Sequence, residues 1–274
     1  MVSVETGTTS MATSTVTGTK KSILGFTFSV LTIVFVLVAV AICFVAGVPW
    51  WVGIFIGAVL AAVATVALSR NVTQPLLSAV GAVDATPESS GKRISNLVEG
   101  LSLTGGIQQP QVYLIHDGAM NAAALAEGES GTILVTSGLL EKLSRVELEG
   151  VVAELVARIK SGDAEVATLS SAIFGRLITG PLSPLTRSFG VNLLNRQYVA
   201  DRDIILDGSA VLLTRYPPGL RGALTKIDGS SSAIAGTLPI YDGVWLVPSG
   251  EESELPVYVG ASDLDLRIAV LSEL

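Results

Sequence analysis

The chain has 274 residues, of which 49% are hydrophobic and 15% charged, and its formal net charge is −7. Such an excess of apolar over charged residues is typical of a protein that lies partly in a membrane. The acidic balance and the lack of a lysine- or arginine-rich stripe exclude a nucleic-acid partner, which needs a basic surface. One cysteine, Cys43, and one histidine, His116, exclude an internal disulfide and a thiolate zinc site.

The first quarter of the sequence predicts a disordered tail followed by a transmembrane helical hairpin. Residues 1–21 are rich in Ser, Thr and Gly, a composition that does not support a folded core. Residues 22–69 carry no charged side chain, and the run is too long for a single span of about 20 residues. The sequence Gly-Val-Pro-Trp-Trp at 47–51 breaks the run. We therefore expect two membrane helices, near 22–46 and 51–69.

A cleaved signal peptide is the alternative to the first span, but its apolar core would exceed the usual length of about 7–15 residues. Lys20 and Lys21 precede the first span, and Arg70 follows the second. The positive-inside rule then places both ends of the hairpin in the cytoplasm. We expect a multi-pass protein of the plasma (inner) membrane, in contact with the lipid bilayer, with its N-terminus and C-terminal domain cytoplasmic.

Residues 70–93 predict a linker, because two prolines and a Glu-Ser-Ser-Gly cluster favour turns. Residues 94–274 predict an α+β, mostly helical domain with a small β-sheet. Alternating and β-branched runs indicate strands over 111–115, 121–125 and 132–136, and the last two form a hairpin.

The second half of this domain predicts helices. In the helix over 144–162, Ser144 and Glu147 form a capping box and Gly162 ends the helix. The apolar stretch 166–194, broken by Gly and Pro, has room for a helical hairpin. The remaining predictions are helices over 94–105, 195–213, 219–227 and 263–274, and a short strand over 244–248.

Five stretches appear in an order and spacing that resemble a known family. They are "NLVEGLSLTGGIQQPQVYLI" (96–115), "MNAAALAEG" (120–128), "ILVTSGLLEKLSRVELEGVVA" (133–153), "RQYVAD" (196–201) and "LRIAVLSEL" (266–274). Together with the membrane hairpin they resemble the HtpX-like membrane zinc metallopeptidases, relatives of the CAAX prenyl proteases. The resemblance implies a gluzincin-like (zincin) domain at the cytoplasmic end of the hairpin.

That family's chemistry depends on H-E-x-x-H in one helix and a glutamate from a later helix. At the corresponding positions this chain reads Glu154-Leu155-Val156-Ala157-Arg158. The resemblance places Glu154 and Arg158 at the two histidine positions and Leu155 at the general base. It places Gln197 at the third-ligand position, and Asp201 at a supporting carboxylate that remains.

These substitutions predict that the zinc of the family is lost. We therefore expect no cofactor and no metal-ligating residues in this chain. Arg158 stays protonated and cannot ligate a metal, and Leu155 cannot accept a proton. A serine or cysteine nucleophile has no support either, because the chain offers one histidine and one cysteine within a membrane span. We therefore expect a pseudopeptidase with no catalytic residues.

Glu154 and Arg158 stand four residues apart, the spacing of a helical ion pair. Our hypothesis is that they form a buried structural bridge, joined by Gln197 and Asp201, where the metal would lie. The alternative is that both side chains are solvated on a surface face. Asn121 is a candidate for the former peptide cleft, because an adjacent strand edge can still bind peptide after catalysis is lost.

The sequence thus predicts a membrane-anchored, catalytically inactive homologue of the HtpX-like peptidases. It would be a binding, scaffolding or regulatory subunit whose partner is a membrane protein or membrane complex. Two alternatives stay open: a divergent, active metalloendopeptidase in membrane-protein quality control, and a structural subunit of a larger membrane complex.

Overall fold

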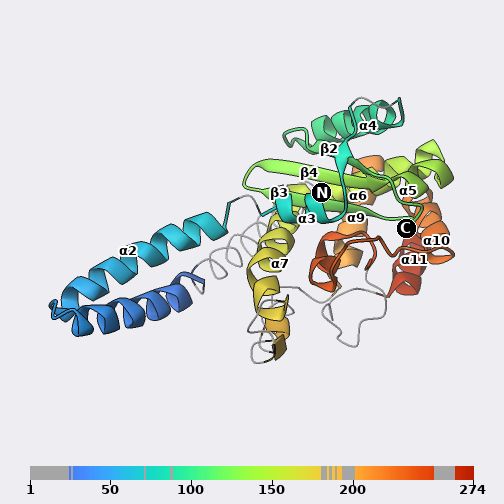
Figure 1. The fold of residues 1–274 in the computed structure, drawn as a ribbon. Helices are drawn as coiled ribbons and strands as arrows, with labels where there is room; N and C mark the ends of the chain where they lie inside the picture. The colour runs from blue at the N-terminus through green and yellow to red at the C-terminus, as the bar shows by residue number, and fades with distance from the viewer. Residues whose placement is uncertain are drawn as a thin grey trace, which may run out of the picture. The chain divides into compact units, whose positions relative to one another are not determined.

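A computed structural model describes residue 25 and residues 27–70, 72–86, 89–179, 184, 187–188, 190–192, 201–249 and 263–274. The chain divides into two compact units, Met1–Val72 and Thr73–Leu274, which are described one at a time (Figure 1).

The first unit contains two apolar helices joined by a short turn. One covers Thr27–Val45, and α2 covers Trp50–Leu68. Both are long and apolar enough to cross a membrane, with mean hydropathy of 3.0 and 2.1 over the spanning windows. Gly47 lies between them with φ +71, a backbone conformation that glycine adopts without strain. The described residues of this unit agree with the two predicted helices and the break between them.

The two helices approach closely along a stripe of small residues on α2. A Cβ atom on Gly57 would lie 2.5 Å from the Cα of Val36, and one on Gly53 would lie 2.8 Å from the Cα of Val40. Ala61, one turn further, is fully buried. In a lipid environment such close backbone contact is a main source of helix association, because lipid removes the hydrophobic driving force.

The second unit is built on a mixed four-stranded sheet with strand order β1-β2-β4-β3. The strands cover Val83–Asp84 (β1), Gln111–Ile115 (β2), Ala122–Glu127 (β3) and Ser130–Thr136 (β4). β2 runs parallel to β4, whereas β3 and β4 form the predicted antiparallel hairpin. β1 pairs with β2 over two residues, so β3 is the long edge strand.

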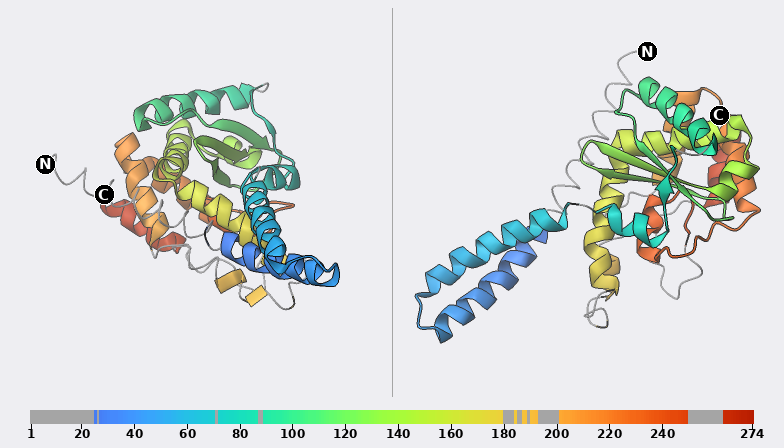
Figure 2. Two further views of the ribbon diagram at one scale, coloured as in Figure 1. Left: turned by 90° about the vertical axis from the view of Figure 1, so that its left-hand side faces the viewer. Right: turned by 45° about the horizontal axis from the view of Figure 1, so that its top comes forward.

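Helices surround this sheet, with α6 at the centre in contact with β3, α4, α7, α9 and α10 (Figures 1 and 2). Leu148, Val151 and Leu155 of α6 share one apolar core with Ile133 and Val135 of β4. The helices are α4 (Ser89–Gly105), α5 (Ser137–Lys142), α6 (Arg145–Ser161), α7 (Asp163–Thr179), α9 (Arg202–Thr214), α10 (Pro217–Asp228) and α11 (Leu264–Glu273). The predicted architecture of many helices and a small sheet is confirmed at this level.

The predicted linker differs from the structure. Residues 74–79 form α3 (Gln74–Ala79), and β1 follows within the same compact unit. Leu76 and Val80 are buried, so apolar burial outweighs the turn tendency that the prolines suggested. Pro75 lies in the first turn of α3, where a missing amide hydrogen costs nothing.

The predicted strand over 244–248 is also different. Pro239–Val244 form a short 3₁₀ helix, η1, and only Trp245 makes a β-bridge, to Ala123. α5 was not predicted. The predicted helix over 195–213 corresponds to α9, and residues 195–200 lie outside the described residues.

Candidate functional site

The candidate site lies in the middle of α6, whose ends follow from local sequence. The Ser144 side chain accepts from the amide of Glu147 at 3.4 Å, and the Glu147 carboxylate accepts from the amide of Ser144 at 2.7 Å. Gly162 closes the helix in the left-handed conformation. These caps leave Glu154 and Arg158 well inside the helix, where both side chains are fully buried.

Arg158 connects α6 to α9. Its Nε donates to Glu154 Oε1 at 2.5 Å, and its Nη2 donates to Asp203 Oδ1 at 3.1 Å. Because Arg158 and Glu154 are both inaccessible to solvent, they do not lie on a solvated surface face.

A second arginine extends these contacts to α7. Arg202, at the start of α9, binds both carboxylate oxygens of Asp163, with Nε at 2.5 Å from Oδ1. Arg202 Nη2 also donates to the carbonyl oxygen of Gly243 at 2.8 Å, and Arg158 Nη1 approaches the same oxygen at 3.5 Å. One backbone carbonyl of η1 therefore faces two guanidinium groups.

A third arginine comes from the last helix. Arg267 of α11 binds Asp207 of α9 through two hydrogen bonds, at 2.8 and 2.7 Å, and donates to the carbonyl of Leu246 at 2.8 Å. Its Nη2 lies 4.0 Å from Glu154 Oε1. We call these residues the arginine–carboxylate network: Glu154, Arg158, Asp163, Arg202, Asp203, Asp207 and Arg267.

The network holds one more carboxylate than guanidinium groups. The negative charge of Glu154 is incompletely compensated by hydrogen bonds, because its Oε2 has no hydrogen-bond partner among the described residues. Removal from water raises the pKa of Glu154, against the lowering effect of Arg158 and Arg267. Burial acts to lower the pKa of Arg158, but the neighbouring carboxylates raise it above its ordinary value. Arg158 therefore remains a cation.

The side chains at this place do not fit a zinc ion. Zinc sites are built from His, Cys, Asp and Glu. In the described part of the chain, no group of three or more such residues could hold a metal ion. The guanidinium of Arg158 lies between the two nearest carboxylates, and a protonated guanidinium repels a dication. Leu155 is fully buried in the apolar core, so its position offers no general base.

Of the other two predicted bridge residues, the structure describes only Asp201, which is not part of the network. Gln197 lies outside the described residues. Asp201 is exposed, and its backbone has a left-handed conformation (φ 59) where α9 begins. Because the helix starts after it, Asp203 rather than Asp201 faces α6. This corrects the predicted role of Asp201.

Sequence reasoning missed most of the network. The signal was present in α9, where Asp203 and Asp207 share one face with Leu206 and Ala210, all four of them buried. Charged residues at core spacing indicate buried ion pairs, because an unpaired charge is rarely tolerated in a core.

Asn121 is a buried hydrogen-bonding centre and does not line an open cleft. Its Nδ2 donates to the carbonyls of Val247 at 2.7 Å and Ser232 at 3.2 Å, and its Oδ1 accepts from the amide of Ala122 at 2.9 Å. These backbone groups use its amide, so Asn121 has a structural role here, and its place beside a former peptide cleft stays a prediction.

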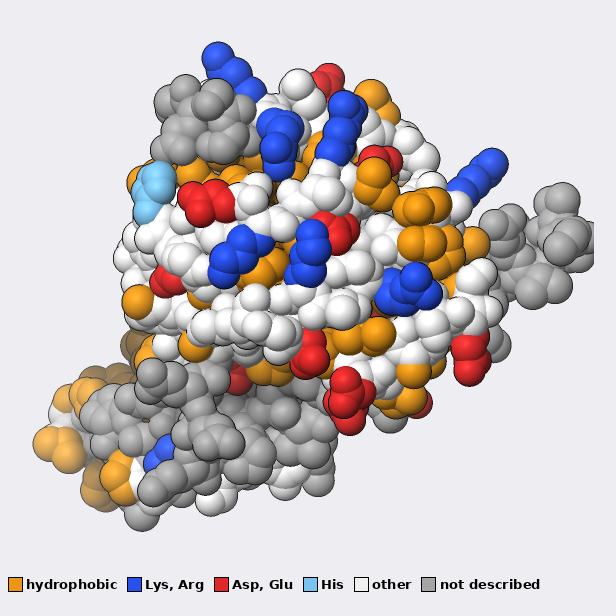
Figure 3. Space-filling view, turned by 90° about the vertical axis from the view of Figure 1, so that its right-hand side faces the viewer, with side chains coloured by type: hydrophobic (Ala, Val, Ile, Leu, Met, Phe, Trp, Pro, Cys, Tyr) orange, Lys and Arg blue, Asp and Glu red, His pale blue; other side chains and the backbone are white. Residues whose placement is uncertain are grey.

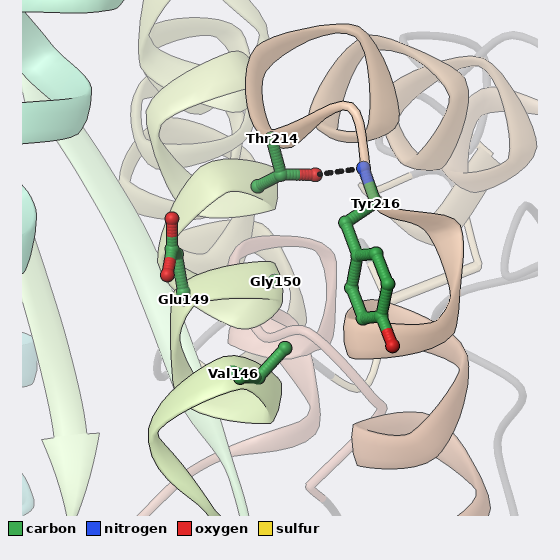
Figure 4. A pocket seen from close by; sticks show the side chains of 5 residues that line it. All are labelled: Val146, Glu149, Gly150, Thr214 and Tyr216. Carbon is green, nitrogen blue, oxygen red and sulfur yellow. Dashed lines mark hydrogen bonds between the residues drawn. The ribbon is translucent and has the colours of Figure 1, made fainter.

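A surface pocket of about 240 Å³ lies elsewhere, between α6 and the α9–α10 turn (Figure 4). Its lining residues are Val146, Glu149, Gly150, Thr214 and Tyr216, none of which belongs to the arginine–carboxylate network. The exposed His116 is also apart from the network, at the end of β2. Figure 3 shows the histidine at the surface, on a face where basic and acidic side chains are interspersed.

These features define the class of protein: an apolar helical hairpin joined to a helix-rich domain with a small mixed sheet. Curated relatives named "Protease HtpX homolog" are similar to this chain. The one from Dictyoglomus thermophilum is 30% identical over 203 residues, covering 63% of this chain and 67% of the relative. The one from Listeria monocytogenes is 29% identical over 222 residues, 65% of this chain and 72% of the relative. The one from Tropheryma whipplei is 31% identical over 166 residues, which cover 51% of this chain and 57% of the relative.

The chain belongs to the HtpX family of membrane peptidase homologues. No family model and no solved structure matches it. Since the whole chain contains one histidine, an H-E-x-x-H motif is absent from it.

Proposed function

We propose that this protein is a non-hydrolytic member of the HtpX family. In this proposal it binds or scaffolds membrane proteins, or regulates an active protease, from the cytoplasmic face of the plasma membrane. The observation that carries the proposal is the position of Arg158, fully buried between Glu154 and Asp203.

Hydrolysis by a zinc peptidase needs a metal-bound water and a base to take its proton. The guanidinium group of Arg158 fills the space between the carboxylates of Glu154 and Asp203. The side chain of Leu155 cannot act as a base. The network instead joins α6, α7, α9 and α11 through side chains alone. It supports a structural role for α6.

The orientation in this proposal rests on the sequence. Lys20, Lys21 and Arg70 flank the two apolar helices, and the turn between the helices carries no charge. The positive-inside rule places the flanks, and with them residues 73–274, in the cytoplasm.

The test is a measurement of zinc content and proteolysis on the full chain in mild detergent. We expect far less than one zinc per chain and no chelator-sensitive cleavage of casein. The Listeria monocytogenes relative, which carries the name "Protease HtpX homolog", is purified and assayed in parallel for comparison. One zinc per chain together with chelator-sensitive cleavage would overturn the proposal.

The active metalloendopeptidase is the second candidate, because the relatives carry the name "Protease HtpX homolog". The same experiment separates the two candidates. Affinity purification from membranes in mild detergent then identifies the partner, with the isolated hairpin, residues 1–72, as a control for capture by the membrane helices alone.

A further inference from the structure

The outer edge of β3 is closed by the chain itself at its N-terminal end. β3 is an edge strand, paired on one side with β4. On the other side the carbonyl of Ala122 accepts from the amide of Leu246 at 2.8 Å. The amide of Ala122 donates to the side chain of Asn121 at 2.9 Å. Trp245 adds an antiparallel bridge to Ala123.

The C-terminal end of the same edge is closed by α7. The amide of Ala126 donates to Thr168 Oγ1 at 3.2 Å, and the amide of Gly128 donates to Glu165 Oε1 at 3.0 Å. An extended peptide joins a sheet through unpaired amides and carbonyls at an edge. The amides of Ala122 and Ala126 and the carbonyl of Ala122 in β3, and the amide of Gly128 just after it, already have partners within the chain.

The segment that closes the N-terminal end is firmly anchored. We call residues 242–247 the edge segment. The Trp245 side chain is 2% exposed, and its Nε1 donates to Thr237 Oγ1 at 3.2 Å. Leu246 is 1% exposed. The edge segment therefore fills apolar space as well as making backbone hydrogen bonds.

All three arginines of the network also hold this segment. Arg202 and Arg158 donate to the carbonyl of Gly243, and Arg267 donates to the carbonyl of Leu246. Hydrogen bonds from charged donors are stronger than those between neutral groups. The three guanidinium groups, from α6, α9 and α11, therefore also bind the backbone segment that covers the edge of β3.

We propose that the edge segment is an internal ligand of β3, held in place by the arginine–carboxylate network, so that an extended peptide can join this edge only by displacing it. This goes beyond the proposed function, because it concerns access to the edge and not hydrolysis. The apparent affinity of a peptide for the edge is then reduced by the fraction of molecules in which the edge segment is released.

The test uses the edge segment as a peptide in trans. A fluorescent peptide with the sequence of residues 240–249, IYDGVWLVPS, is titrated into full-length protein in detergent. The Trp245→Ala variant loses the anchor of the internal segment and leaves a cavity that the peptide's tryptophan can fill. A peptide with alanine at the tryptophan position is the matched control.

We expect the tryptophan peptide to bind the variant at least about tenfold more tightly than the wild type, because the competitor is weakened. The peptide should also raise the melting temperature of the variant, and the alanine peptide should do neither. Equal binding to both proteins would overturn the proposal, and so would no binding to a variant that circular dichroism shows to be folded.

Hydrogen exchange on the wild type covers the case in which the variant does not fold. The amides of Leu246 and Ala126 are expected to exchange as slowly as those of the central strand β4. Exchange at the rate of an unstructured peptide would overturn the proposal. Cleavage of the added peptide would contradict the proposed non-hydrolytic function. It would not contradict the proposal that the edge segment is an internal ligand of β3.

Discussion

Helices are held together in two different ways in the two units of this protein. In the membrane hairpin, Gly53 and Gly57 allow the α2 backbone to approach that of the preceding helix, and apolar atoms make the contact. In the second unit, Arg158 joins α6 to α9 through buried charges. The first contact depends on shape, and the second depends on the pairing of buried charges.

This difference determines how each region responds to substitution. A glycine contact fails when volume is added, since neighbouring backbone cannot move aside. A buried ion network fails when one member is removed, because its partner is left charged without water. The predictions below apply these two changes in order of expected effect.

Replacing Arg158 with alanine should have the largest effect, a loss of about 3–5 kcal/mol in the free energy of unfolding. The substitution leaves Glu154 and Asp203 buried without their shared cation. Urea unfolding followed by tryptophan fluorescence measures it.

Lys226→Ala is the matched control, because it breaks the exposed pair between Lys226 and Glu147. That pair should contribute about 0–1 kcal/mol. Equal losses in the two variants would show that Arg158 adds no more than a surface contact.

Replacing Gly57 with leucine should separate the two apolar helices at a cost of about 1–3 kcal/mol. Even the first added carbon would lie 2.5 Å from the Cα of Val36. A denaturing-detergent titration of helicity in micelles measures the loss. Val59→Leu, at a position 47% exposed, adds volume without a close neighbour and should be neutral. Similar behaviour of the two variants would remove the case for close helix contact.

Replacing Glu154 with glutamine should produce a smaller effect that depends on pH. The raised pKa of Glu154 means that the folded protein retains a proton that the unfolded chain releases. The stability from that proton is complete below the ordinary carboxyl pKa and is lost as pH rises through the raised value. Glutamine does not titrate, so the melting temperature of the variant relative to wild type should rise as the pH increases above the ordinary carboxyl pKa of about 4. A constant or falling difference would show that the pKa of Glu154 is not raised in the folded protein.

Treatment with a zinc chelator should have the smallest effect, with no change in melting temperature, because side chains alone join the helices. The Listeria monocytogenes homologue, treated in the same way, is the comparison. A chelator-dependent loss of stability in this chain would reveal a structural metal.

The elements with strong local signals could be predicted from the sequence. The capping box of Ser144 and Glu147 marked the start of α6, and the uncharged run marked both apolar helices. Gln111–Ile115 form a strand over the predicted residues, because β-branched and aromatic residues dominate there.

The members of the candidate site could be predicted only in part. Glu154 and Arg158 pair within one helix, so their spacing carries the information. Arg267 lies 60 residues from Asp207 in sequence, and only the packing of α11 against α9 brings them together. Asp201 and Asp203 are two residues apart, and which of them faces α6 depends on where α9 begins. Helix starts are the least certain part of sequence-based assignment.

The arginine–carboxylate network has a consequence for how the protein is made in the cell. A metal-crosslinked domain acquires its crosslink from outside and competes for it with every other zinc protein. Here Arg158, Arg202 and Arg267 are encoded in the chain, and each crosslink forms as the helices assemble. The amount of folded protein should therefore stay constant when cells are starved of zinc, a condition in which a domain crosslinked by zinc would lose its crosslink.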